Sequence, residues 1–300
     1  MGIWYVKRMD SQDEIPLLKR MFFIPEIKQI QNYYKVILPV KNGKELNAKM
    51  QKKIGESISK KIYEKQNQNL VLANSLKLKT LKNTLYANNL NILDGRKLFK
   101  YLLPQVIKYI AKAKDIDSHE IEVSIMTNDN SENTMKLLIE LAQDIKMLSI
   151  VTDDIDRYKA MEEYLLVNMG IVIRTTNNKK RGLLKSNLII NLDFPEDIVN
   201  SYSLPKNGII VNMNEKIAIK SKKFNGINCN SYKIKLSDEE EKYFRENNIF
   251  EDFNENELFE STIFLKRTYE AIKNEINKRK IEYLIGNNGK ISKEEYKKLE

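Results

Sequence analysis

The residues best suited to binding lie in the loop Thr127-Asn128-Asp129-Asn130-Ser131-Glu132, between an apolar run and an amphipathic one. A strand–loop–helix junction of this kind binds phosphate when glycines let the backbone approach the anion. This loop has no glycine, and Asp129 and Glu132 stand where phosphate charges would lie. Bulk and charge repulsion therefore disfavour the usual dinucleotide site. The same residues suit a structural role, in which Asn130 or Ser131 caps the next helix and the acids face its positive end.

A second pair of acids, Asp153 and Asp154, follows the apolar run Met147–Val151. An acid after the second strand of a dinucleotide-binding unit holds the ribose hydroxyls and disfavours a 2′-phosphate. Both acids could equally cap a helix that begins at Ile155. The two interpretations stay open.

Several other chemistries are excluded by composition. With one cysteine and one histidine, the chain has no disulfide framework and too few ligands for a Cys/His zinc site. A Ser-His-Asp triad would have to use His119. We read the lone Cys229 as a reduced structural thiol.

The C-terminal run Asn287–Glu295 resembles half of a calcium-binding loop. Leu284 and Gly286 would occupy the first and third ligand positions, so calcium is not expected, and no other metal is. A turn at Gly289 and a helix with Ser292 and Glu295 in a capping box are expected instead.

The elements that position these residues follow from the spacing of apolar side chains. In residues 1–115, β-branched and aromatic runs indicate strands, and apolar residues at helical spacing indicate helices. Pro104 lies inside the last helix of this region and is expected to kink it. The expected strands are Ile3–Lys7, Tyr33–Val40, Leu70–Ala73 and Leu90–Leu93, and the expected helices are Lys44–Lys65, Lys79–Ala87 and Lys97–Ala113.

In residues 116–236, expected strands and expected helices alternate most regularly. Strands that alternate with helices of this length favour right-handed βαβ units and a parallel sheet, which is a Rossmann-like order. Near-continuous apolar runs also fit strands that are buried on both faces. The expected strands are Ile121–Met126, Met147–Val151, Ile171–Arg174, Leu188–Leu192 and Gly208–Val211, and the expected helices are Asn133–Ile145 and Ile155–Asn168.

The last region is expected to be helical, with an acidic helix over Asp238–Asn247 and a long amphipathic one from Glu257 to Ile285 through Leu265. The sequence as a whole predicts an α/β protein. An N-terminal α/β domain with its linking helix covers residues 1–115, and a Rossmann-like domain with a doubly wound parallel sheet covers 116–236. C-terminal helices in 237–300 return to pack on these domains.

Charge is distributed unevenly over the 300 residues, whose net charge is +10. Residues 1–115 contain 23 basic and 9 acidic side chains, whereas residues 116–236 contain 16 of each. The abundance of Lys, Asn and Ile also matches the codon usage of an AT-rich genome. The basic face of one expected helix is either a solvated surface or a nucleic-acid or polyanion surface, and no nucleic-acid-binding motif supports the second. Its lysines are Lys49, Lys52, Lys53, Lys60, Lys61 and Lys65.

Membrane and export signals are not evident in the sequence. No apolar run approaches the ~18 residues that span a bilayer, and the N-terminal residues lack the pattern of a secretory signal. We therefore expect a cytoplasmic protein without membrane contact.

Short collinear motifs resemble those of the shikimate/quinate dehydrogenases. Val36-Ile-Leu-Pro39-Val-Lys41 is similar to that family's Pro-x-Lys, and Asn91-Ile-Leu-Asp94-Gly95 to its Asn-Thr-Asp-Gly. Leu188-Ile-Ile-Asn191-Leu-Asp193 resembles its Asn-Ala-Thr-Pro strand end. The resemblance covers most of residues 1–285 and implies a substrate domain, a Rossmann domain that binds NAD(P), and Lys41 with Asp94 as the catalytic proton-transfer pair. The cofactor-binding residues would be Thr127, Asn128, Ser131, Asp153 and Asn191.

Two departures from that family shape the functional expectation. Asp13 and Ile15 replace the serine pair that grips the substrate carboxylate, and an acid there repels a carboxylate. The glycine-rich cofactor loop is replaced by Thr127–Glu132. We therefore expect a degenerate relative without a cofactor, acting as a non-catalytic binding or regulatory protein for a different small ligand or a protein partner. The alternatives are an NAD(P)-dependent oxidoreductase and a nucleic-acid or polyanion binder.

Overall fold

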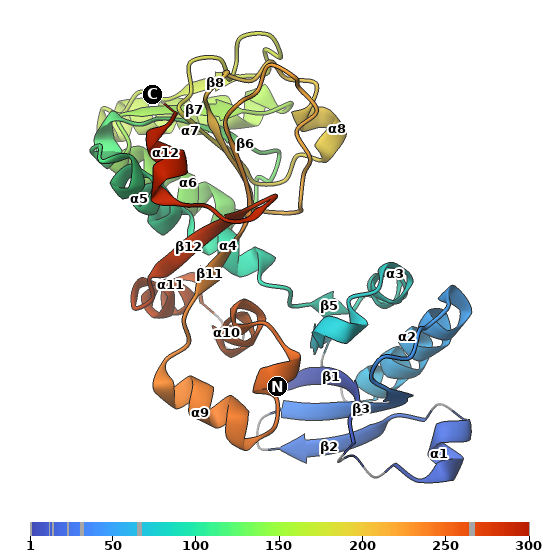
Figure 1. The fold of residues 1–300 in the computed structure, drawn as a ribbon. Helices are drawn as coiled ribbons and strands as arrows, with labels where there is room; N and C mark the ends of the chain where they lie inside the picture. The colour runs from blue at the N-terminus through green and yellow to red at the C-terminus, as the bar shows by residue number, and fades with distance from the viewer. Residues whose placement is uncertain are drawn as a thin grey trace. The chain divides into compact units, whose positions relative to one another are not determined.

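The computed structural model describes residues 2–11, 13, 15–22, 24–30, 33–64, 68–263 and 268–299. Lys65 and Leu265, which belong to two of the expected helices, lie outside this range. The chain is a mixed α/β protein that forms two compact units (Figure 1). Each unit combines two stretches of sequence: unit 1 is Met1–Gly95 with Lys235–Ile272, and unit 2 is Arg96–Ile234 with Lys273–Glu300. The linking helix therefore groups with the second unit, and the C-terminal segment is divided between the two.

The described residues of unit 1 form a five-stranded sheet in the order β2-β3-β1-β4-β5. Strands β3, β1, β4 and β5 are parallel, and β2 is an antiparallel edge strand. The central strand β1 is buried along its whole length, as its aromatic and β-branched sequence predicts. The strands are β1 (Ile3–Met9), β2 (Glu26–Ile30), β3 (Tyr33–Lys41), β4 (Asn69–Leu72) and β5 (Asn91–Ile92).

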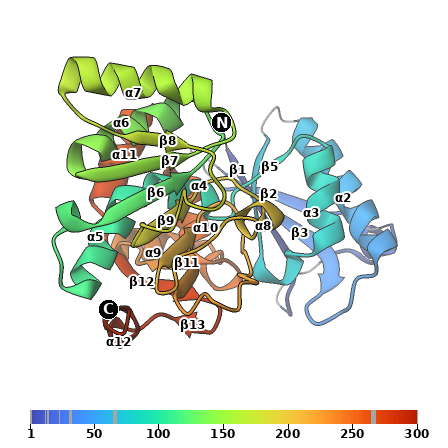
Figure 2. The same ribbon diagram turned by 90° about the horizontal axis from the view of Figure 1, so that it is seen from above.

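The helices of unit 1 come from both stretches of its sequence. Helices α2 and α3 pack side by side (Figure 2), and Asn47 begins α2 by accepting a hydrogen bond from Met50 N. Ser237 and Glu240 form a capping box at the start of α9. The elements are α1 (Leu17–Met21), α2 (Ala48–Tyr63), η1 (Asn74–Leu76), α3 (Lys79–Ala87), α9 (Asp238–Glu246), η3 (Phe250–Asp252) and α10 (Glu255–Ile263).

Unit 2 contains an eight-stranded sheet in the order β13-β12-β11-β10-β9-β6-β7-β8. From β8 to β11 the neighbours are parallel, and the order matches the doubly wound arrangement in which the first strand lies beside the fourth. This confirms the expected Rossmann-like fold. The strands are β6 (Glu122–Met126), β7 (Met147–Val151), β8 (Arg174–Thr176), β9 (Leu188–Asn191), β10 (Ile209–Asn212), β11 (Ile227–Ile234), β12 (Ile281–Gly286) and β13 (Gly289–Lys290).

The helices of unit 2 agree closely with the sequence pattern. The helix expected over Lys97–Ala113 is interrupted beside Pro104, which lies in the first turn of the second segment, where its missing N–H costs little. Ser292 and Glu295 form the expected capping box, and Gly289 has the positive φ of a turn, +108°. The elements are α4 (Arg96–Tyr101), α5 (Leu103–Lys114), η2 (Ser118–Glu120), α6 (Glu132–Asp144), α7 (Ile155–Met169), α8 (Glu196–Val199) and α12 (Lys293–Lys297). Helix α11 (Tyr269–Asn277) spans the unit boundary.

The long helix expected over Glu257–Ile285 is wrong in its last part. After α11 the chain forms strand β12, in which Leu284 lies opposite Tyr232 of the antiparallel strand β11. The apolar residues of β12 fit helical and strand spacing about equally well. Pairing with β11 supplies hydrogen-bond partners for the backbone, and this nonlocal contact decides the outcome.

Other strands differ in position from the sequence-based expectation. The strand expected at Ile171–Arg174 is shifted to β8, and Val172 is 72% exposed. Strands β2 and β11 were not expected because their polar residues obscure the pattern. In the burial pattern of β11, buried residues largely alternate with partly buried ones, which is the period of a half-buried strand.

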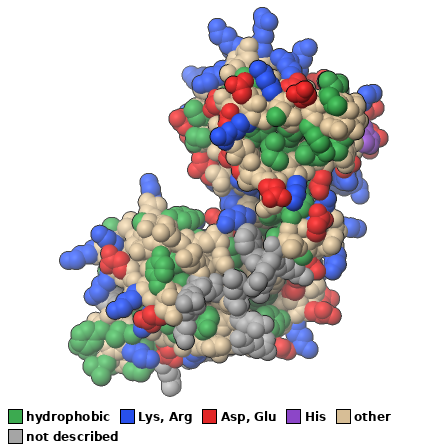
Figure 3. All heavy atoms as spheres, turned by 180° about the vertical axis from the view of Figure 1, so that it is seen from behind, with side chains coloured by type: hydrophobic (Ala, Val, Ile, Leu, Met, Phe, Trp, Pro, Cys, Tyr) green, Lys and Arg blue, Asp and Glu red, His purple; other side chains and the backbone are tan. Residues whose placement is uncertain are grey.

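The surface carries one further feature of unit 1. Exposed apolar side chains gather over α1, including Leu17, Leu18 and Phe22, at the lower left of Figure 3.

Among the described residues, none of the helices combines the length and the apolar character that a bilayer crossing requires. Cys229 is buried in β11, and burial raises the pKa of its thiol to about 12, as befits a structural thiol.

Candidate functional site

The switch in strand order of unit 2 lies between β6 and β9, the place where open α/β sheets bind their ligands. The loop after β6 approaches the turn after β9, and the Asp193 carboxylate contacts its backbone. Asn128 N lies 3.0 and 3.1 Å from the two Asp193 oxygens, and Asp129 N donates to Oδ2 over 2.7 Å. The Thr127 hydroxyl donates to the same oxygen over 2.9 Å. The Asp193 carboxylate thus accepts the backbone hydrogen bonds that a bound phosphate would otherwise accept.

The turn that carries Asp193 is held by Asn191, which is 1% exposed. Its amide donates to Phe194 O and accepts from Phe194 N, both over 2.9 Å. Asn191 therefore serves as a positioning residue for Asp193. A cofactor role would require its amide to leave these hydrogen bonds.

Other polar groups of the loop form hydrogen bonds within the loop and with the first turn of α6. Ser131 is the N-cap of α6, accepting from Thr134 N, as expected from the sequence. Asp129 accepts from Ser131 N over 2.9 Å and from the Thr134 hydroxyl over 2.7 Å. Burial by itself raises the pKa of Asp129, but these hydrogen bonds outweigh it and hold the pKa below its usual range.

Asn128 and Asp153 form the second part of the network. Asn128 Oδ1 accepts from Asp153 N and from the Thr152 hydroxyl, each over 2.9 Å, and its amide donates to Asp153 Oδ2 over 3.2 Å. Asp154 occupies the N-cap position of α7 but makes no capping hydrogen bond there; it pairs with Arg157 over 3.0 Å. The predicted residues Thr127, Asn128, Ser131 and Asp153 are thus brought together, in contact mainly with one another and with Asp193. Sequence reasoning missed the role of Asp193, for which the signal was an acid two residues after a buried strand.

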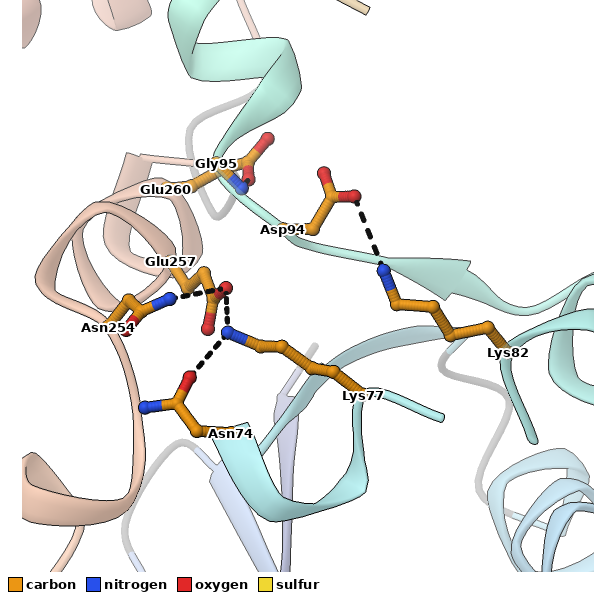
Figure 4. Close-up of polar contacts among 8 residues, drawn as sticks. All are labelled: Asn74, Lys77, Lys82, Asp94, Gly95, Asn254, Glu257 and Glu260. Carbon is orange, nitrogen blue, oxygen red and sulfur yellow. Dashed lines mark hydrogen bonds and ion pairs between the residues drawn. The ribbon is translucent and has the colours of Figure 1, made fainter. Parts of the chain in front are cut away.

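Lys41 and Asp94 lie in unit 1 at the ends of two different strands, and no hydrogen bond or ion pair joins them among the described residues. Lys41 ends β3 and is exposed, whereas Asp94 follows β5. Strands β1 and β4 lie between β3 and β5, a separation of about 14 Å at the usual strand spacing. Asp94 instead lies 3.9 Å from Lys82 Nζ (Figure 4).

Figure 4 also shows two buried acids of α10 that sequence reasoning missed. Glu260 accepts a hydrogen bond from Gly95 N, and Glu257 pairs with Lys77. Burial raises the pKa of Glu257, and Lys77 opposes that effect without cancelling it. Each acid has a donor within the unit, so the arrangement fits packing of α10 on the sheet. The residues that the structure describes include no group of three or more His, Cys, Asp or Glu side chains placed to hold a metal ion.

The lysines of the expected basic helix lie on α2. Lys49, Lys52, Lys53 and Lys60 are exposed, and Lys61 pairs with Glu64 over 3.2 Å. The helix has a cationic face, as its sequence predicted, and whether a polyanion binds there stays a prediction.

Comparisons with known proteins find weak structural similarities. No protein-family profile matches the chain, and no curated protein is significantly similar in sequence. L-tryptophan dehydrogenase from Nostoc punctiforme superposes with a TM-score of 0.33 at 8% identity, covering 92% of this chain and 80% of that one. Aspartate transcarbamoylase from Trypanosoma cruzi, with aspartate and phosphate, gives 0.30 at 10% identity, covering 92% and 81%. Ornithine transcarbamoylase from Giardia lamblia gives 0.26 at 10% identity, covering 70% and 72%. Similarities this low establish neither a family nor an activity for this chain.

Proposed function

We propose that the protein is a non-catalytic binding or regulatory protein whose Rossmann-like unit does not bind a nicotinamide nucleotide. The observation that supports this most strongly is the Asp193 carboxylate against the N–H groups of Asn128 and Asp129, at 2.7–3.1 Å. A pyrophosphate would have to displace this carboxylate and remain beside its negative charge. The residues present do not fit NAD(P).

A distant relationship to the shikimate/quinate dehydrogenases belongs to the same proposal. The strand order of unit 2 and the Asn191–Phe194 turn at the end of β9 are compatible with it. The alternative activity, an NAD(P)-dependent oxidation with Lys41 and Asp94 as the acid/base pair, has less support. Two strands separate those residues, and proton transfer requires both within hydrogen-bond reach of one substrate.

Titration of NADH and NADPH, followed by nucleotide fluorescence, tests the proposal. The wild-type chain should show no sub-millimolar binding. Asp193→Ala removes one negative charge and frees two N–H groups, so it should bind NADH at least tenfold more tightly than wild type, which corresponds to ~1.4 kcal/mol. Asp197→Ala is the matched control, since Asp197 is an exposed acid on the next helix.

The control variant should bind NADH no better than wild type, and circular dichroism should show that both variants keep the fold. Sub-millimolar binding of either nucleotide by the wild-type chain would contradict the proposal.

A further inference from the structure

A cavity of about 700 Å³ lies within unit 1, between the strands β1, β2 and β3 and the segment from α9 to η3. Its volume is in the range of small-molecule sites, ~300–1,000 Å³. The lining is strongly polar, and all of its residues belong to unit 1. The Asp193 loop belongs to unit 2, so a ligand in this cavity is independent of the proposed function.

Three lysines from neighbouring strands line the cavity on the sheet side: Lys7, Lys28 and Lys35. Lys35 lies opposite Lys28 of β2 and opposite Tyr5 of β1. Because side chains alternate between the faces of a strand, Lys7 shares the face of Tyr5 and lies next to Lys35 diagonally. Three ammonium groups on adjacent strands are unfavourable unless anions neutralise them.

Three of the neighbouring cations already have anionic partners, and the first of them, Lys28, lies 3.4 Å from Glu26. Lys7 Nζ lies 2.9 Å from Asp10 Oδ2 and 2.7 Å from Asp252 Oδ2. Arg245 donates two hydrogen bonds to Glu241, at 2.9 and 2.7 Å, and its guanidinium lies over the Phe250 ring. These cations are not available to hold a ligand by themselves.

Lys35 differs from them. Lys35 is 8% exposed, and none of the described residues accepts a hydrogen bond from its ammonium or lies within ion-pair distance of it. Aromatic side chains desolvate this part of the sheet: Tyr5 packs on Phe244 of α9 and on Tyr33 of β3. Burial, followed by the nearby Lys7 charge, lowers the pKa of Lys35 more than the charges of Asp13 and Asp10 raise it. Among the described residues this largely buried cation has no direct anionic partner, and an anion in the cavity would supply one.

We propose that this cavity is a binding site for a small polar anion whose carboxylate or phosphate group pairs with the Lys35 ammonium. Asp13, which also lines the cavity, sets a second requirement. One of its oxygens accepts from Asp10 N, and its charge repels a second anionic group nearby. The ligand therefore carries a hydroxyl or amino donor for Asp13, as a hydroxy acid or a sugar phosphate does.

Thermal unfolding with added inorganic phosphate, succinate or L-malate, each against NaCl of equal ionic strength, tests the site. L-Malate differs from succinate by one added hydroxyl, and of these two carboxylates it should raise the wild-type unfolding midpoint more. Inorganic phosphate tests whether the site binds a phosphate group instead of a carboxylate. Lys35→Met should abolish the rise and weaken binding at least tenfold by calorimetry, since a charge-assisted hydrogen bond is lost. Lys52→Met, at an exposed position on α2, should keep the full response.

Lys35→Met has a second readout without any ligand. Removing this largely buried charge, which has no ion-pair partner among the described residues, should raise the unfolding midpoint by about 2–4 °C, whereas the midpoint would fall if Lys35 stabilised the fold. Asp13→Asn keeps Lys35 but removes the Asp13 charge that repels a second carboxylate. The midpoint shifts caused by L-malate and by succinate should therefore become more similar. An equal response in Lys35→Met and wild type, or no response to any of the three anions, would overturn the proposal.

Discussion

At the scale of single residues, the acids of α10 show how burial and pairing balance. The Glu257 side chain is 5% exposed and Lys77 is its cation, while the second Glu257 oxygen has no hydrogen-bond partner among the described residues. The cost of removing the Glu257 carboxylate from water is therefore only partly offset by its pairing with Lys77. Removing one partner of such a pair costs more than removing both, because a lone buried charge remains.

Lys77→Met should destabilise the chain by about 3–5 kcal/mol, whereas Lys77→Met combined with Glu257→Gln should recover most of that loss. Lys61→Met, in the exposed pair with Glu64, should cost less than about 1 kcal/mol. Urea unfolding measures all three. Equal losses in Lys77→Met and Lys61→Met would show that Glu257 is not held as a buried carboxylate.

The same residue gives a pH dependence. The folded-state pKa of Glu257 lies above its ordinary value of 4.5, so the folded chain binds this proton more tightly than the unfolded chain. Protonation of Glu257 therefore favours folding. The loss in free energy of unfolding caused by Lys77→Met should shrink as the pH falls below that raised pKa. A deficit that grows on acidification would contradict this assignment.

At the scale of elements, the packing of α2 on α3 depends on one glycine. A Cβ added at Gly55 would lie 2.8 Å from Thr84 Cγ2 of α3 and 2.9 Å from its Cβ, and a β-branched threonine cannot easily move aside. The glycine lets the two helices approach at a cost in helix propensity.

Gly55→Ala should therefore destabilise unit 1 by about 1–3 kcal/mol through overpacking, against a gain of up to ~1 kcal/mol in helix propensity. Glu56→Ala, at the next and exposed position, should change stability little. Chemical denaturation gives both values. A more stable Gly55→Ala protein would show that the helices can separate at no cost.

At the scale of the whole molecule, each unit needs the C-terminal segment of the chain, residues 237–300. Aromatic side chains of α9 and Phe253, which follows η3, pack on Tyr5 and Tyr33 of unit 1. Strand β12 pairs with β11 in unit 2. The C-terminal segment is thus part of both units rather than an addition to them.

A chain that ends at residue 236 should fail to fold, because it leaves aromatic residues uncovered and the β11 edge unpaired. Solubility and near-ultraviolet circular dichroism check this. A control chain that ends after Lys297 keeps β12 and the buried Tyr296, and it should fold normally. A soluble, cooperatively unfolding 1–236 fragment would contradict the expected dependence.

The sequence by itself determined the features that depend on local spacing. Helix α3, strand β7, the cap at Ser131, the interruption beside Pro104 and the capping box at Ser292 all follow from propensity and from hydrogen bonds within a few residues. The alternation of strands and helices was enough to predict the α/β class and the Rossmann-like order.

Only the tertiary structure decided the features that depend on contacts far apart in the chain. Strand β12 is a strand because β11 lies beside it. Asp193 closes a loop 64–66 residues earlier. Lys35 lines one cavity with Lys7 and the α9 segment only after the sheet forms. Local sequence cannot specify these contacts, because their free energy arises when separate segments bury a common surface.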